Sequence, residues 1–211
     1  AEEIESAARK GSDLVGKLLT LAREKELDLS VADLGRIVED GKTSIRALLP
    51  ESVSLETSLD EGLTASVDEG ELQQILLNLT TNAADSMPEG GTLSIGLTSI
   101  RGRPPGSSEE PGTSGPSYAR LRVEDTGAGV DQETLARIFD PFFTTKAEGT
   151  GLGLAMVRSL VHQQGGFIQV ESRPGEGTTF ELFFPLREPV PGEGEAEEGR
   201  DRSDPGLPEG S

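Results

Sequence analysis

The sequence predicts an α+β fold, a two-layer α/β sandwich in which helices cover one face of a mixed, mostly antiparallel sheet, preceded by an N-terminal helix. Segments with apolar residues at three- and four-residue spacing, which is typical of amphipathic helices, are interspersed with short β-rich runs. Gly, Pro and Asp stand at the boundaries of these segments. The hydrophobic content of 33% is low for a fully packed chain of 211 residues, so part of the sequence is expected outside the core.

Helices are expected where apolar residues repeat at helical spacing. The helix that begins at Asp68 is the best marked, because Asp68 can cap its first turn, Glu71 follows three residues later as in a capping box, and Pro88 stops it. The N-terminal helix has an apolar stripe that needs a partner. We favour a dimerisation helix, and packing on its own domain stays open. The expected helices cover residues 2–26, 31–49, 68–87 and 152–164.

Strands are expected in the β-rich runs. The first two runs are expected to form a hairpin around residues 60–62. The third and fourth should pair despite the long loop between them, and the last two flank a turn at residues 173–177 that contains Pro and Gly. The expected strands cover residues 53–59, 63–67, 92–100, 118–124, 167–171 and 178–184.

Composition excludes several classes of function. The formal net charge of −19 argues against nucleic-acid binding, which is driven by Lys and Arg that neutralise phosphates. The chain has no Cys and one His, so neither a disulfide framework nor a thiolate zinc site can form. Since no run of roughly 18 apolar residues and no signal sequence occurs, we expect a cytoplasmic chain without membrane contact. Because it begins at Ala1 inside an expected helix, we also expect a fragment of something longer.

The first chemical cluster lies on the helix after Asp68. Asn78, Asn82 and Asp85 are spaced four and three residues apart, so their side chains share one helical face beside the apolar stripe. A solvated polar face is the simplest interpretation. The functional alternative is a site of oxygen ligands, because the Asn side-chain carbonyl suits Mg²⁺, which takes phosphate oxygens and waters as its other ligands.

A second cluster, residues 125–129, follows a strand directly. It could be a simple turn anchored by Asp125. Its chemistry also suits an adenine pocket, because an ionised carboxylate only accepts hydrogen bonds and can take one from the exocyclic amine of the base. Gly127 and Gly129 would allow the backbone to approach the base closely.

A third cluster runs through residues 139–146 and 149–154 and ends where a helix begins. Glycines that lead into a helix N-terminus form an anion site from free N–H groups and the helix dipole. Neither a Walker loop nor a Gly-x-Gly-x-x-Gly fingerprint is present, so both common nucleotide motifs are excluded. Phe142 and Phe143 are core residues by default, or anchors of a mobile lid.

Taken in order, these clusters resemble the histidine-kinase ATPase family, which shares its Bergerat-type nucleotide fold with DNA gyrase, the ninety-kilodalton heat-shock chaperone and the mismatch-repair ATPases. One motif alone would be weak, but several in the family's order are specific. The Asn box corresponds to residues 78–85, the first glycine box to 125–129, the Phe box to 139–146, the second glycine box to 149–154 and a last box to 175–180.

The resemblance implies the ATP-binding catalytic part of a sensor histidine kinase, with ATP and Mg²⁺ as its cofactors. It implies that Asn82 ligates Mg²⁺, that Asn78 assists at the phosphates and that Asp125 reads the adenine amine. Its implied catalytic residues are Asn78, Asn82 and Lys146. Its implied ATP-binding residues are Asn78, Asn82, Asp85, Asp125, Gly127, Gly129, Phe139, Thr144, Thr145, Lys146, Gly149, Gly151, Leu152, Gly153, Leu154 and Thr178.

The resemblance also implies domains and partners. Residues 1–27 would be one helix of a dimerisation hairpin and residues 28–187 the ATP-binding domain. The clustering of Gly and Pro predicts, independently of the resemblance, a disordered insertion at 101–117 and a disordered acidic tail at 188–211. Expected partners are a histidine-bearing hairpin, a response-regulator receiver domain and, in the full-length protein, a second copy.

The family's phosphoacceptor His lies on the first hairpin helix, and this chain has no His before His162. The γ-phosphoryl would therefore go to a histidine outside the chain, and we interpret His162 as a residue that packs or favours its helix dipole. Asn78 stands where the gyrase and chaperone relatives place a Glu that activates water, which favours phosphoryl transfer over hydrolysis. Two other functions stay open, a nucleotide-binding regulatory scaffold without transfer and an anti-sigma-type serine kinase.

Overall fold

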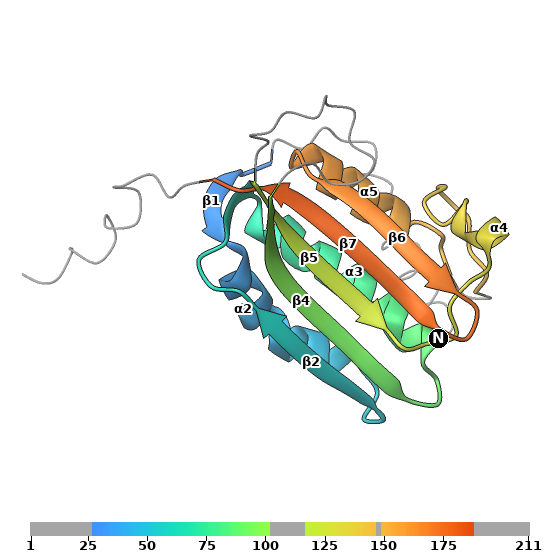
Figure 1. Ribbon diagram of the computed structural model, residues 1–211. Helices are drawn as coiled ribbons and strands as arrows, with labels where there is room; N and C mark the ends of the chain where they lie inside the picture. Colours follow the sequence, from blue (N-terminus) through green and yellow to red (C-terminus); the bar gives the residue numbers. More distant parts are fainter. Residues whose placement is uncertain (1–26, 102–116, 147–148, 188–211) are drawn as a thin grey trace, which may run out of the picture.

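A five-stranded sheet with helices on one of its faces forms the body of the protein (Figure 1). The computed structural model describes residues 27–101, 117–146 and 149–187. Helices α2 (Leu34–Leu48), α3 (Glu69–Ser86) and α5 (Gly153–Gln163) make up the second layer, and α3 contacts both of the others. The two-layer α/β fold that the sequence predicted is confirmed. The expected N-terminal helix, the tail and residues 102–116 of the expected insertion lie outside the described residues, whereas Arg101 and Ser117, the ends of that insertion, are strand residues.

The sheet is mixed and mostly antiparallel. Its strand order is β2 (Val53–Leu59), β4 (Gly91–Arg101), β5 (Ser117–Asp125), β7 (Gly177–Pro185) and β6 (Phe167–Arg173). Only the β2–β4 pair of this sheet is parallel. The expected pairing of β4 with β5 is confirmed, and it brings Arg101 opposite Ser117. The two described residues that flank positions 102–116 are therefore neighbours in the sheet.

The hairpin expected between residues 53–59 and 63–67 is wrong. Strand β2 pairs with β4, whereas β3 (Thr64–Val67) pairs with β1 (Ser30–Asp33) in a separate two-stranded sheet. The sequence had placed most of β1 inside the second helix. That helix begins at Leu34 because the Asp33 side chain accepts from the N–H groups of Gly35 and Arg36, so the residues before the cap are free to pair.

The core lies between the sheet and the helix layer. The predicted apolar stripe of α3, formed by Leu72, Ile75, Leu76 and Leu79, is at most 1% exposed. Burial of each such side chain stabilises the fold by about 1.5 to 3 kcal/mol. The predicted N-cap is also present, since Asp68 accepts from the N–H of Glu71 at 3.0 Å. This helix therefore has a fixed rotation, which determines where its polar face points.

The end of α3 and the end of β5 meet at one edge of the fold. The N–H of Ala128, just after β5, donates to the C=O of Ser86 at 3.1 Å. Asp125 pairs with Thr178 across β5 and β7. A short helix that the sequence did not reveal, α4 (Gln132–Leu135), follows the same loop and is capped by Asp131. Within the described ranges, no helix is long and apolar enough to cross a membrane.

Candidate functional site

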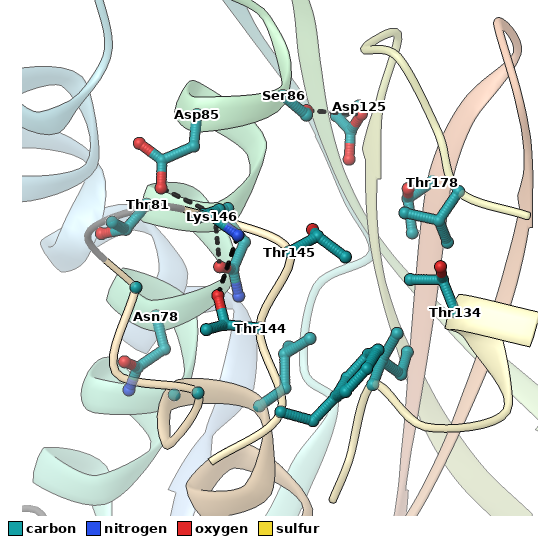
Figure 2. A pocket seen from close by; sticks show the side chains of 18 of the residues that line it. Asn78, Thr81, Asp85, Ser86, Asp125, Thr134, Thr144, Thr145, Lys146 and Thr178 are labelled. Atoms are coloured by element: carbon teal, nitrogen blue, oxygen red, sulfur yellow. Dashed lines mark hydrogen bonds and ion pairs between the residues drawn. The ribbon is translucent and has the colours of Figure 1, made fainter. Parts of the chain in front are cut away.

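A cavity of about 470 Å³ opens between the polar face of α3, the start of α5, and β7 (Figure 2). Its volume falls in the usual range for sites that bind small molecules. Most residues that the sequence predicted for the site line this cavity. They are Asn78, Asn82, Asp85, Asp125, Gly129, Thr144, Thr145, Lys146, Gly149, Gly151, Gly153, Leu154 and Thr178.

Three predicted site residues support the cavity wall and do not line it. Gly127 donates its N–H to Asp125 Oδ1 at 2.8 Å, behind the carboxylate. Leu152 is fully buried, and its C=O accepts from the N–H of Met156 at the start of α5. Phe139 packs partly buried against the core, with the Arg158 guanidinium 5.4 Å from its ring centroid. These three residues pack against neighbouring elements and shape the cavity wall, and their assignment as ATP-binding residues stays a prediction.

One end of the cavity holds a buried carboxylate. Asp125 is 6% exposed, and its Oδ1 accepts from the N–H of Gly127 and from Ser86 Oγ at 3.0 Å. Burial raises the pKa of Asp125 above its usual range, while the hydrogen bonds from Gly127 and Ser86 lower it. Strand β5 positions this acceptor, since Asp125 is its last residue. A group of this kind accepts a hydrogen bond from an amine in a site from which water is largely excluded.

Buried Asp125 predicts a pH dependence of stability in the absence of ligand. Because its folded pKa lies above the unfolded value, Asp125 favours folding most at pH values below the unfolded pKa, and this contribution is lost as the pH rises through the folded pKa. Asp125→Asn does not titrate. The parent should therefore lose stability between acidic and neutral pH through Asp125, and the variant should not. We expect the difference between the free energies of unfolding, variant minus parent, to increase as the pH rises over this window. Urea unfolding of both proteins across that window checks this, and a difference that is independent of pH would contradict it.

At the other end of the cavity, the ammonium group of Lys146 contacts side-chain oxygens of α3. Lys146 Nζ lies 3.0 Å from Asn82 Oδ1 and 2.7 Å from Asp85 Oδ2 (Figure 2). About half of the Asp85 side chain is exposed, so this ion pair contributes little to stability. Asn78 donates its Nδ2 to the C=O of Gln74, one turn earlier in the helix. The polar face of α3 is therefore a set of hard oxygen donors that already accommodates a positive charge.

Glycines bring the backbone close to the cavity at two points. Gly129 and Gly151 both have positive φ angles, of 61° and 66°. A Cβ at Gly129 would collide with the C=O of Arg173, and one at Gly151 with the backbone of Phe142. Leu152, the residue before α5, provides no side-chain cap, and the next residue, Gly153, lines the cavity. The N-terminus of α5 thus faces the cavity, which suits an anion.

The two phenylalanines of the Phe box have different environments. Phe142 is 62% exposed and has a φ of 67°, so the default expectation of a core residue is wrong for it. Its N–H donates to the C=O of Gly151, which fixes this unusual backbone. Phe143 is half-buried, lines the cavity and stacks under the Arg137 guanidinium at 4.3 Å. The sequence around Phe142 and Phe143 does not indicate which of them is exposed and which lines the cavity.

The cavity also contains residues that the sequence analysis missed. Thr81 and Ser86 lie three and four residues after Asn78 and Asn82 on α3, so extending the helical spacing could have found them. The others contribute apolar surface or hydroxyl groups from loops, α4 and β7, where sequence spacing carries no such signal. His162 lies exposed near the end of α5 and is not among the cavity residues. The missed residues are Thr81, Ser86, Val130, Thr134, Ile138, Phe143, Thr150 and Phe180.

Comparison with known families identifies a match over most of the described domain. Residues 67–188 match the family described as histidine kinase-, DNA gyrase B-, and HSP90-like ATPase. The matched region includes every residue that lines the cavity.

Two curated proteins and one solved structure show the range of similarity. The chain is 36% identical over 185 residues to the sensor kinase CckA of Brucella abortus (strain 2308), covering 86% of this chain and 20% of that protein. It is 34% identical over 191 residues to the sensor histidine kinase ZraS of Escherichia coli (strain K12), covering 88% and 37%. The crystal structure of full-length ShkA in complex with AMPPNP has 28% identity and a TM-score of 0.66, covering 88% of this chain and 39% of that one. The chain thus spans little more than a third, or less, of these proteins.

Proposed function

Because the chain belongs to the histidine kinase-, DNA gyrase B-, and HSP90-like ATPase family, we propose that its cavity binds Mg·ATP and that it is the catalytic part of a sensor histidine kinase. It would transfer the γ-phosphoryl group to a histidine outside this chain, for relay to a response-regulator aspartate. The similarity to CckA and ZraS, both named as sensor kinases, supports this class of reaction. The complex of ShkA with AMPPNP supports a nucleotide in the cavity.

The observation that carries the proposal is the chemical polarity of the cavity. A buried acceptor, Asp125, lies at one end, and the oxygens of α3, Lys146 and the N-terminus of α5 lie at the other. Apolar side chains, including Ile138 and Phe180, line the cavity as well. An adenine nucleotide has the complementary arrangement, with an exocyclic amine at one end and charged phosphates at the other.

The donor set on α3 fits Mg²⁺. Asn82 Oδ1 and Asp85 Oδ2 both lie within hydrogen-bond distance of one ammonium group, so the two oxygens already converge on a single cation. Hard oxygen ligands of this kind suit Mg²⁺ when phosphate oxygens and water complete its coordination. We assign Asn82 as the metal ligand, with Asp85 beside it. A bound Mg²⁺ would neutralise part of the charge on the phosphates.

Lys146 would then exchange one partner for another. Its ammonium contacts the same oxygens that we assign to the metal, so the arrival of Mg·ATP requires it to move. The nearest alternative anion would be a nucleotide phosphate, for which Lys is a common ligand. The N–H groups at the start of α5, after Gly151 and Gly153, would hold the phosphates from the opposite side.

The chemistry of Asn78 supports transfer over hydrolysis. A carboxylate could accept a proton from water, whereas the amide of Asn78 has no basic group with which to activate it. Positioning and electrostatic stabilisation of the phosphoryl group would therefore supply most of the catalysis. The acceptor histidine would come from a dimerisation hairpin, of which residues 1–27 would form one helix, in a homodimer of the full-length protein. Residues 28–187 would be the catalytic domain, with the 101–117 insertion and the 188–211 tail outside its core.

A phosphotransfer assay tests the proposal and separates it from both alternatives. The chain is incubated with ATP labelled at the γ-phosphate, Mg²⁺ and a hairpin protein that carries an acceptor histidine. We expect phosphate on the hairpin that is labile in acid and stable in base, as a phosphohistidine is. A hairpin with His→Ala at the acceptor position serves as the control. Acid-stable phosphate would indicate a serine kinase, and ATP binding without any transfer would indicate a regulatory scaffold.

A further inference from the structure

Ser86, the last residue of α3, contacts the loop that follows β5 with both its backbone and its side chain. Its C=O accepts from the N–H of Ala128 at 3.1 Å. Its Oγ lies 3.0 Å from Asp125 Oδ1 and 2.8 Å from the C=O of Ala83, so the one hydroxyl hydrogen is shared between these two acceptors. The helix terminus and the loop are thereby held together at the buried carboxylate.

The hydrogen bonds that Ser86 and Gly127 donate to Asp125 are asymmetric. Ser86 Oγ and the Gly127 N–H both donate to the same oxygen, Oδ1. The second oxygen of the carboxylate points away from Ser86 into the open part of the cavity (Figure 2). A carboxylate that is held by one oxygen presents the other in a fixed direction, which is what recognition of a single N–H donor requires.

The packing at Gly127 gives an independent indication that Ser86 belongs to this arrangement. A Cβ at residue 127 would collide with Ser86 Oγ and would lie 2.7 Å from Asp125 Oδ1. Gly127 is not among the glycines with positive φ, so its backbone conformation is open to other residues. Glycine is needed there for space, because the Ser86 hydroxyl fills the place that a side chain would take.

We propose that Ser86 is a positioning residue that determines base specificity: with the Gly127 N–H it holds Oδ1 of Asp125, so that the other carboxylate oxygen reads the exocyclic amine of adenine. This inference rests on the proposed function, since it assumes an adenine nucleotide in the cavity. Ser86 acts through Asp125 and does not itself contact the base.

The electrostatic surroundings of Asp125 predict how loss of the Ser86 hydroxyl would change the pKa of Asp125. Burial raises the pKa of Asp125 most, and neighbouring Glu124 raises it slightly. The hydrogen bonds from Gly127, Ser86 and the Thr178 backbone stabilise the charged form and lower the pKa. Removal of the Ser86 hydroxyl takes away one of these donors, so the pKa of Asp125 should rise further.

The experiment compares Ser86→Ala with Ser159→Ala. Ser159 is a helical serine on α5 that does not line the cavity, and its Oγ accepts from Gln163 Nε2 at 2.9 Å. We expect Ser86→Ala to weaken ATP binding about 2- to 10-fold, the factor that a net hydrogen bond is worth, with a smaller effect on GTP. The ratio of the ATP and GTP dissociation constants should therefore move toward one in Ser86→Ala and stay at the parent value in Ser159→Ala.

A second readout does not need nucleotide. A carbon NMR titration of the Asp125 carboxyl group should give a higher pKa in Ser86→Ala than in the parent or in Ser159→Ala. If the parent selects ATP over GTP but Ser86→Ala keeps both the parent's selectivity and its Asp125 pKa, the inference about Ser86 is wrong and the proposed function stands. If the parent binds no adenine nucleotide, the proposed function fails and the specificity role of Ser86 fails with it.

Discussion

Asn82→Ala is expected to remove most of the Mg²⁺-dependent affinity for ATP and to leave the fold intact. The side chain is half-buried on the polar face of α3, and the structure gives its Oδ1 one described partner, Lys146. Its loss removes a hard oxygen ligand without opening a hole in the core, because the buried α3 stripe lies on the neighbouring face of the helix. The affinity for Mg·ATP should fall about 10- to 100-fold. Mutation of residues that only orient a metal ligand already lowers metal affinity by this factor.

Calorimetric titration with ATP, with Mg²⁺ and with a chelator, measures this effect. Gln73→Ala is the matched control, because Gln73 is an exposed amide of α3 that does not line the cavity. The parent and Gln73→Ala should both gain affinity on addition of Mg²⁺, whereas Asn82→Ala should gain little. An Asn82→Ala protein that binds Mg·ATP as tightly as the parent would show that the metal ligand lies elsewhere.

Asp125→Asn is expected to weaken binding of ATP selectively. In the variant the side-chain oxygen can stay with the Ser86 and Gly127 donors, which leaves the NH₂ group facing the cavity. A donor would then face the exocyclic amine of adenine, at a cost of about 1 to 3 kcal/mol for the unpaired groups. ATP affinity should fall roughly 5- to 150-fold by that arithmetic.

Paired titrations with ATP and GTP distinguish base recognition from a structural role of Asp125. GTP presents a carbonyl where adenine has its amine, so its affinity should be unchanged or increased in Asp125→Asn. The phosphate end of the cavity, at Lys146 and the start of α5, is unaltered in this variant. Equal losses for both nucleotides would mean that Asp125 supports the fold and does not read the base.

The sequence predicted the parts of the fold that depend on local patterns. The apolar stripe of α3 and its cap at Asp68 follow from helical spacing and first-turn chemistry, and both are present. The same spacing placed Asn78, Asn82 and Asp85 on one face, which the structure turns toward the cavity. Helical geometry is set by neighbours in the sequence, so it can be predicted without knowledge of the tertiary fold.

The errors concern contacts between distant segments. Strand β2 pairs with β4 and not with its sequence neighbour β3, a choice that depends on which strands the rest of the sheet brings together. Gly127, Phe139 and Leu152 belong to the motifs but pack behind the cavity wall, a placement that local spacing does not predict, and their assignment as ATP-binding residues stays a prediction. Ser86 lies one turn after Asn82 on α3, but its contact with Asp125 joins residues 39 positions apart, which helical spacing does not predict.

The central claim is that this cavity is an Mg·ATP site, and an equilibrium titration of the parent chain with ATP tests it most directly. The account predicts binding of one ATP per chain, tighter with Mg²⁺ than with a chelator, weaker for GTP, and accompanied by perturbation of the Asp125 carboxyl resonance. Binding that ignores both Mg²⁺ and the identity of the base, or that leaves the Asp125 resonance unchanged, would contradict it.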